Sequence, residues 1–396
     1  MYIFAQEKMI LGGAETLIIR LAEIICTRGY EVAVYAKEIS EEIRIKAENA
    51  GATVIADMGW SRLLAQRSFD ENDKILTVQF KSFLEVQYEM KKNNNYCDVL
   101  FYDVHVYDLF MDLKSKVIYR QLLYRPYKKM ISEFYSNGNI FFMEENCTRY
   151  AEDYYDISLG GSRDVWLLPM CIEPYGEEDL PAKAESRRGS FEVLSVARAD
   201  FPFKGYIKGL IEDAREAKKR HPNLKLTIVT RGDGFDQVLE WAAGDDFITI
   251  INGMDPKDLK SLYESSHLFF GMGTTVLDAA MNGTPVVPVN HFTYKCEAAR
   301  FFYEDPRYIA IRCDDDCLYD AGHFIDQVAM MSDREYIETC HKVRDAVVQN
   351  YDIELFVDRL LGHKVDKKEN YLCRRYEVKH WLHSASVSMK KWIGRE

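Results

Sequence analysis

The sequence predicts an α/β protein of two domains, each built on a doubly wound parallel sheet. The chain has 396 residues, a length that fits two domains of ordinary size. Short apolar stretches with strand character alternate with stretches of helical periodicity, which is typical of parallel sheets. The alternation pauses once, in a polar segment with glycine and proline at residues 173–189, and then restarts. We therefore expect two Rossmann-like domains facing each other across a cleft, at residues 1–172 and 173–350.

The first domain opens with a strand, a helix and a second strand. Residues 2–6 form a short apolar run, and apolar positions at helical spacing follow at residues 16–28, before Gly29. Residues 31–36, with the sequence EVAVYA, complete a βαβ unit, so the strands of this sheet are expected to be parallel. The other strands expected here are at residues 52–55, 74–78, 98–104, 139–143 and 164–169.

The second domain repeats this order after residues 173–189, which we interpret as a linker. Strands are expected at residues 191–197, 224–230, 247–251, 268–270 and 285–289, and helices at 208–220, 256–264 and 276–281. Asn282 and Gly283 form a typical helix stop after the last of these helices. The C-terminal part, residues 351–396, is expected to hold a helix at 353–361 and a basic tail from residue 364.

Composition narrows the class of protein. The formal net charge is -12 and the sequence pI is about 5.4, whereas a protein that binds nucleic acid through its phosphates is usually basic, so we expect no nucleic-acid partner. No apolar run approaches the roughly 18 residues of a spanning helix, and the first residues lack the pattern of a signal peptide. We expect a cytoplasmic protein.

The nine cysteines are scattered along the chain and are expected to be reduced thiols. The closest pair, Cys313 and Cys317, has only His323 nearby as a further metal ligand. We therefore expect no metal site.

Two short motifs follow strands and can approach a ligand. Gly12 and Gly13 lie between the first strand and the first helix, where glycines let the backbone come close to a phosphate and the helix start offers free N–H groups. Arg198 and Lys204 follow the first strand of the second domain, in SVARADFPFKG. Open α/β sheets bind ligands at this edge, so the two cations are candidates to neutralise a diphosphate. A plain turn and a solvated loop remain the alternatives.

The third motif is a glycine-rich loop that opens a helix in the second domain. In GMGTTVLD, the N–H groups after Gly273, those of Thr274 and Thr275, are candidates to bind phosphate oxygens. Asp278 follows about one turn into the helix, where its carboxylate could accept hydrogen bonds from two ribose hydroxyls. A carboxylate near a helix start can also serve only the helix dipole.

Together these motifs resemble the GT-B-fold glycosyltransferases of family 4. GGAETLIIRLAEIICTRGYEVAVYA is similar to the opening βαβ unit of that family, SVARADFPFKG to its diphosphate site, and FFGMGTTVLDAAMNGTPVV to its donor-binding helix and the next strand. The resemblance covers residues 1–361. It implies a nucleotide-sugar donor, linked to UDP or GDP, bound by the second domain, and an acceptor held by the first. It also implies that the helix at 353–361 packs back towards the first domain.

The resemblance implies a role for each candidate. Arg198 and Lys204 would stabilise the departing diphosphate, Asp278 would hold the ribose, and Gly12 and Gly13 would approach the phosphates or the sugar. Gly253 and Met254, after Asn252, would contact the base. The reaction implied is retaining and uses no metal or other cofactor. The acceptor would be a glycan, a glycolipid or a protein, in the synthesis of surface polysaccharide or glycoconjugates.

One position departs from the family pattern. The family carries two acidic residues eight positions apart around the donor helix; Asp278 matches the second, and the first falls at Phe270. This leaves open the identity of the sugar and the stereochemistry. The alternatives are an inverting GT-B enzyme and a catalytically weak GT-B-like partner subunit. A dehydrogenase is disfavoured because no G-x-G-x-x-G follows a strand.

Weaker candidates lie in the first domain. His105 follows the strand at 98–104 and is a candidate for the reacting centre, as are Glu145 and Asn146. The stretch YRQLLYRPYKK at residues 119–129 and the basic tail could contact an anionic membrane surface or a lipid phosphate. A solvated helix face is the alternative for residues 119–129.

Overall fold

The chain folds into two compact units. The computed structural model describes residues 1–10, 13–56, 58–60, 62–63, 69–93, 97–104, 109, 120–159, 165–173, 176–312, 315 and 317–366, with the backbone alone at 120–126 and 256–257. One unit comprises Met1–Pro169 and Ile353–Glu396, and the other Met170–Asp352. Each unit is described below by itself.

The first unit contains a six-stranded parallel sheet in the order β3-β2-β1-β4-β5-β6. Its strands are β1 (Tyr2–Met9), β2 (Val32–Ile39), β3 (Thr53–Ala56), β4 (Lys74–Thr77), β5 (Asp98–Asp103) and β6 (Ile140–Phe142). Its helices are α1 (Gly13–Thr27), α2 (Glu41–Asn49), α4 (Phe80–Lys92), α5 (Arg120–Ser136), α6 (Glu145–Tyr155) and α14 (Ile353–Gly362). This is the doubly wound strand order of a Rossmann fold, and an apolar cluster fills each face of the sheet.

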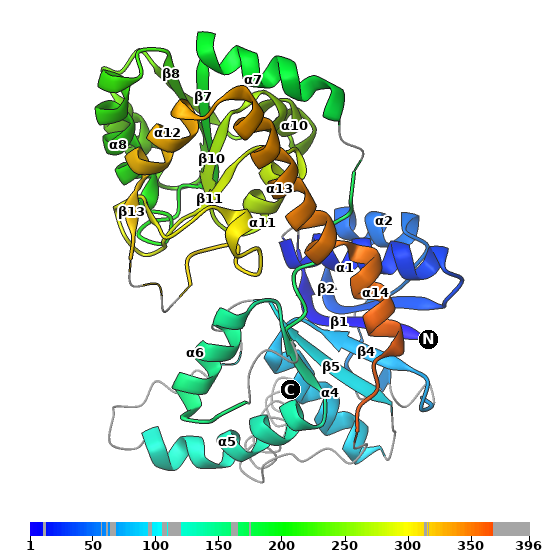
Figure 1. Ribbon diagram of the computed structural model, residues 1–396. Helices are drawn as coiled ribbons and strands as arrows, with labels where there is room; N and C mark the ends of the chain where they lie inside the picture. The colour runs from blue at the N-terminus through cyan, green and yellow to red at the C-terminus, as the bar shows by residue number, and fades with distance from the viewer. Residues whose placement is uncertain are drawn as a thin grey trace, which may run out of the picture. The chain divides into compact units, whose positions relative to one another are not determined.

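Helix α14 completes the first unit although it comes last in the chain. Figure 1 shows it beside α1, and Phe356 packs 5.2 Å from the ring of Tyr102 and 5.4 Å from that of Trp166. Arg28, which directly follows α1, forms ion pairs with Glu354 and Asp358. The apolar face of α14 therefore belongs to the core of the first unit.

The second unit contains a five-stranded parallel sheet in the order β11-β10-β7-β8-β9. Its strands are β7 (Phe191–Arg198), β8 (Leu224–Arg231), β9 (Ile248–Asn252), β10 (Leu268–Gly271) and β11 (Val286–Pro288), with a short antiparallel pair of β12 (Glu297–Ala298) and β13 (Tyr319–Asp320). Its helices are η3 (Glu177–Asp179), α7 (Leu180–Gly189), α8 (Tyr206–Arg220), α9 (Phe235–Ala242), α10 (Pro256–Ser265), α11 (Thr274–Met281), η4 (Phe302–Glu304), α12 (Ala321–Met330) and α13 (Asp333–Tyr351). Helices lie on both faces of this sheet, as Figure 1 shows.

Two expectations about secondary structure are wrong. The linker expected at 173–189 is largely helical, because Leu180 and Ala184 are buried in the core of the second unit. The Arg187 guanidinium is buried beside them and donates to the carbonyl of Met331 at 2.6 Å. The strand expected at 164–169 reduces, in the described residues, to one isolated bridge between Val165 and Phe142.

Candidate active site

The second sheet reverses its direction of winding between β7 and β10. The connection from β7 leads through α8 to β8, on one side, and the connection from β10 leads through α11 to β11, on the other. The loops after these two neighbouring strands therefore diverge and leave a crevice at the carboxyl edge, where open α/β sheets bind ligands. The structure brings the predicted Arg198–Lys204 loop and the glycine loop at 271–275 to this one edge.

The loop after β7 presents two cations. Arg198 is the last residue of β7 and is exposed. The N–H of Lys204 donates to the carbonyl of Asp200 at 2.7 Å, which closes a tight turn, and the Lys204 ammonium lies 4.9 Å from the centre of the Phe203 ring. Burial, together with the positive charge of Arg198, lowers the pKa of Lys204 to about 8, against a smaller opposing effect of Asp200. An anion bound here would relieve the repulsion between the two cations.

A third cation, Arg231, was missed by the sequence reasoning. It ends β8 directly beside Arg198, since the two are register partners and the N–H of Ala199 donates to the Arg231 carbonyl at 2.8 Å. Both arginines are exposed, and within the described ranges no carboxylate pairs with either. Two like charges side by side without a counter-charge are typical of an anion site. The sequence does contain a signal for Arg231, because in TRGDG a basic residue ends the predicted strand and precedes a glycine.

Glycines shape the loop between β10 and α11. Gly273 has φ +76° and ψ -148°, a conformation that is essentially restricted to glycine. A Cβ at Gly271 would lie 2.5 Å from the Phe269 ring, so this position also requires glycine. The Gly273 N–H is already used, since it donates to the carbonyl of Ile309 at 2.7 Å. The N–H groups of Thr274 and Thr275 open α11 and, as in any first helical turn, have no intrahelical acceptor.

Asp278 lies on α11, four residues after Thr274 and so on the same side of the helix. Asp278 is partly buried. The pKa of Tyr263 on α10 is raised by the burial of Tyr263 and then by the negative charge of Asp278, so the two side chains are near each other. Helix α10 follows the Gly253–Met254 turn at the end of β9. In that turn Gly253 has φ +66°, and a Cβ there would lie 3.5 Å from Cδ of Arg231. Asp278 thus lies on the side of α11 that approaches α10.

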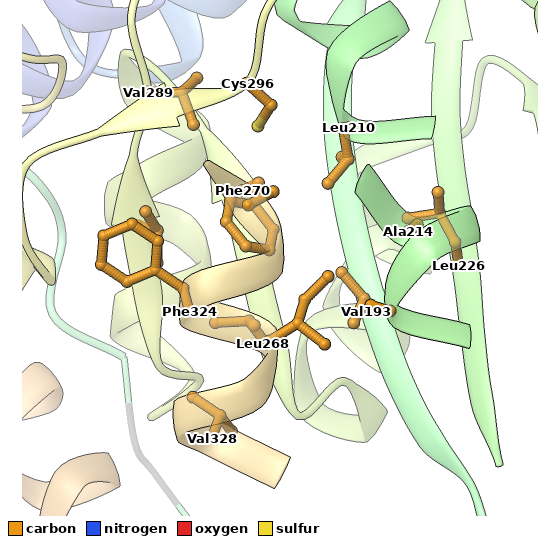
Figure 2. Close-up of a cluster of buried hydrophobic side chains, with 14 of the residues drawn as sticks. Val193, Leu210, Ala214, Leu226, Leu268, Phe270, Val289, Cys296, Phe324 and Val328 are labelled. Carbon is orange, nitrogen blue, oxygen red and sulfur yellow. The ribbon is translucent and has the colours of Figure 1, made fainter. Parts of the chain in front are cut away.

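Phe270 does not face the carboxyl edge. It pairs with Val287 within the sheet, and its side chain is fully buried, 6.5 Å from the ring of Phe324. Figure 2 shows it among Val289, Cys296 and Phe324. The Phe269 side chain points to the opposite face of β10, where its ring lies 5.8 Å from that of Tyr263. Phe270 of this chain is therefore not placed to contact a ligand at the carboxyl edge. Strand β10 extends through residue 271, so residue 270 belongs to the core and not to a loop.

The candidates of the first unit are only partly described. Gly12 and His105 lie outside the described residues, and Gly13 begins α1. Glu145 forms an ion pair with Arg149 at 3.0 Å, and Asn146 is buried.

Residues 120–129 of the basic stretch belong to α5, residue 119 lies outside the described residues, and both lysines of the stretch have acidic neighbours. Lys128 pairs with Asp156 at 2.8 Å and Lys129 lies 3.6 Å from Glu133. These pairs agree with a solvated helix face as well as with a surface for lipid phosphate.

Two observations apply only to the described part of the chain. It contains no group of three or more His, Cys, Asp or Glu side chains placed to hold a metal ion. None of its helices is both long and apolar enough to cross a bilayer. The basic tail from residue 367 and Cys313 lie outside it.

Comparison with known proteins identifies the class. Residues 176–300 match the family model described as "Glycosyl transferases group 1", a range that contains the carboxyl edge described above. No curated protein sequence is significantly similar to the chain.

Solved structures with the same fold are distant in sequence. A glycosyltransferase from Rickettsia africae is 14% identical with a TM-score of 0.62, covering 91% of this chain and 96% of its own. WaaG, a glycosyltransferase involved in lipopolysaccharide biosynthesis, is 15% identical with a TM-score of 0.54, and the match covers 91% of this chain and 98% of WaaG. A trehalose-6-phosphate synthase studied for glycosyl transfer with retention is 12% identical with a TM-score of 0.55, and the match covers 91% of this chain and 98% of the synthase chain. The predicted GT-B fold and the glycosyltransferase class are thus confirmed, while membership of family 4 stays a prediction.

Proposed function

We propose that this chain transfers a sugar from a nucleoside-diphosphate sugar to a hydroxyl group of an acceptor. The observation that carries the proposal is the set of three cations, Arg198, Lys204 and Arg231, at the carboxyl edge of the second sheet. They lie at or just after the carboxyl ends of β7 and β8, and α11 begins after the carboxyl end of β10, the strand next to β7. The net charge of the chain is -12. A cationic edge in an acidic protein marks a binding site for a multiply charged anion, and a diphosphate is the anion that a nucleotide-sugar carries.

The cations would act on the leaving group. When the bond between the anomeric carbon and the phosphate oxygen breaks, the electron pair stays on that oxygen. Arg198 and Lys204 would neutralise the new charge, and the N–H groups of Thr274 and Thr275 would donate to the other phosphate oxygens. The acceptor oxygen bonds to the anomeric carbon, and its proton passes to the departing phosphate oxygen, which has kept the electron pair of the broken bond. His105, in the first unit, remains our candidate for a polar side chain at the reacting centre.

The nucleoside would lie between α11 and the loop after β9. Asp278 would accept hydrogen bonds from the ribose hydroxyls. Gly253 and Met254 would contact the base through their backbone groups, and Gly12 and Gly13 would approach the phosphates from the first unit. The stem of Arg231 packs near Gly253, so its guanidinium would lie between the base and the diphosphate.

We further propose retention of configuration and no requirement for a metal. The trehalose-6-phosphate synthase neighbour, which transfers with retention, supports the first point at the level of the fold. The burial of Phe270 keeps two alternatives open, an inverting enzyme and a catalytically weak partner subunit, because no acid stands at that position. Nuclear magnetic resonance of the product anomer separates retention from inversion, and turnover in excess EDTA tests the metal.

For the acceptor we propose a glycan, a lipid-linked sugar or a protein, in polysaccharide or glycoconjugate synthesis. WaaG, which acts in lipopolysaccharide biosynthesis, supports a glycoconjugate acceptor. The exposed lysine at position 129 and the basic tail fit peripheral contact with the inner face of the cytoplasmic membrane. Co-sedimentation with vesicles that contain anionic lipid would test this contact.

The decisive experiment measures nucleotide release from a panel of UDP- and GDP-sugars in the presence of hydroxyl acceptors. We expect turnover with one donor, and a loss of about a hundredfold or more in Arg198→Ala, the usual cost of removing a charge-stabilising group. Lys208→Ala, on the neighbouring helix α8 and outside the site, is the matched control and keeps the rate. Full activity of Arg198→Ala would remove this edge from the mechanism.

A further inference from the structure

The loop after β11 reaches the cations from the far side of β10. The N–H of Val289 donates to the carbonyl of Gly271 at 3.0 Å, and the N–H of Phe292 donates to the carbonyl of Phe203 at 3.1 Å. Strand β10 lies between β11 and β7 in the sheet, so the loop crosses the carboxyl end of β10 to make the second bond. Residues 290–293 therefore border the same crevice as Lys204.

His291 is the polar side chain that this loop carries towards Lys204. Its ring lies 5.9 Å from the Phe203 ring and 5.3 Å from the Phe292 ring, with edge-on or tilted geometry. Nδ1 is buried and, among the residues that the structure describes, has no hydrogen-bond partner. Burial, and then the positive charge of Lys204, lower the pKa of His291, so the ring is neutral at pH 7 and offers one N–H donor and one acceptor. Buried polar atoms without a partner are rare in folded proteins, and such an atom beside a cation is a candidate to contact a bound anion or a water.

The backbone at the next residue is strained. Phe292 has φ +55°, a left-handed conformation that bulky residues seldom adopt, and half of its side chain is exposed. Strain of this kind concentrates at ligand sites, where the surrounding structure maintains it. Here it fixes the loop so that the Phe203 and Phe292 rings enclose the imidazole beside Lys204.

We infer that His291 is a further side chain of the diphosphate site, in addition to the three cations, and that it hydrogen-bonds a phosphate oxygen next to Lys204 from the loop after β11. The inference rests on the proposed function, because the anion it serves is the diphosphate of the donor. The aromatic neighbours, Phe203 and Phe292, would exclude water from this bond and so strengthen it. His291 would contribute to ground-state binding of the nucleotide as well as to stabilisation of the leaving group.

The test is calorimetric titration of inorganic pyrophosphate, of UDP and GDP, and of the corresponding nucleosides, with three variants. His291→Leu removes the hydrogen bond, and His291→Gln keeps a donor and an acceptor on a similar stem. His341→Gln, on α13 away from the loop, is the matched control. We expect His291→Leu to bind pyrophosphate and the nucleoside diphosphate about tenfold more weakly, with nucleoside affinity unchanged, because a hydrogen bond to a charged group is lost. We expect His291→Gln to recover part of the loss and His341→Gln to match wild type.

Arg198→Ala distinguishes the failure of this inference from the failure of the proposed function. If Arg198→Ala weakens pyrophosphate binding while a folded His291→Leu binds like wild type, the role of His291 is refuted and the diphosphate site stands. If neither change matters, or if wild type binds neither pyrophosphate nor a nucleoside diphosphate, the site itself is wrong and the inference fails with it. Should His291→Leu not fold, as its melting temperature would reveal, His291→Met takes its place, because it also lacks the hydrogen bond. Wild-type affinity for pyrophosphate in a folded His291→Met would equally overturn the inference.

Discussion

The pH dependence of nucleotide affinity tests the role of Lys204 directly. Burial and the charge of Arg198 lower the pKa of Lys204 to about 8 in the free protein. A bound diphosphate favours the charged ammonium, so binding is strongest where Lys204 is protonated. Lys204 is mostly charged at pH 7 and about one-tenth charged at pH 9. We therefore expect the affinity for UDP or GDP to be steady up to about pH 7 and to fall about tenfold between pH 7 and pH 9.

The size of the fall has an upper limit. A charge-assisted hydrogen bond contributes about 1.5–3 kcal/mol, which is roughly ten- to a hundredfold in affinity. Lys204→Met should bind the nucleotide more weakly by this factor at pH 7 and should lose the fall above pH 8. Lys204→Arg keeps its charge at high pH and should also show a flat profile. The assay is calorimetric titration from pH 6.5 to 9.5, with melting temperatures recorded at each pH.

Lys208→Met is the control for these variants, because Lys208 lies on α8 and its ammonium faces Glu212 at 3.6 Å, away from the crevice. It should reproduce the wild-type profile. A fall above pH 8 that persists unchanged in Lys204→Met would show that another group titrates. A flat wild-type profile would mean that Lys204 does not touch the anion.

Three further predictions follow from the second unit. Asp278→Asn should weaken the free nucleotide and the nucleotide-sugar alike, by about ten- to a hundredfold in calorimetric titration, because the contact is to the shared ribose; wild-type affinity would make Asp278 a helix-start charge only. Phe270→Glu should lower the free energy of unfolding by about 4 kcal/mol or more in urea, because it removes a buried ring and buries a carboxylate, and a protein as stable as wild type would contradict the core position. Burial and the charge of Lys183 lower the pKa of His267 to about 4. As the pH falls, His267 is therefore protonated in the unfolded chain before it is protonated in the folded protein, so the free energy of unfolding should decrease between about pH 6.5 and pH 4, by about 2 kcal/mol at pH 5. His267→Gln should lack this part of the acid dependence, and an identical dependence in that variant would show that another group is responsible.

Local sequence patterns were sufficient for most of the fold. Short apolar runs identified strands β1, β2, β7 and β8 to within a few residues. A strand that is buried on both faces of a sheet needs such a continuous apolar run. The same patterns failed at residues 180–189, where Leu180 and Ala184 bury one narrow face of a helix that is otherwise polar. The average composition of this segment is polar, so it does not reveal a helix that is held to the core by only a few buried side chains.

The candidate site divides in the same way. The sequence by itself determined that Arg198, Lys204 and the glycine loop follow strands, and parallel strands place such loops at one edge. Only the tertiary structure decided three further points. It paired β7 with β8, which sets Arg231 beside Arg198. It directed the side chain of Phe270 on β10 into the core and away from the carboxyl edge. It carried His291 across the end of β10 to Lys204. Each depends on strand pairing or on a loop path between residues distant in the chain, and neighbouring residues carry no information about such contacts.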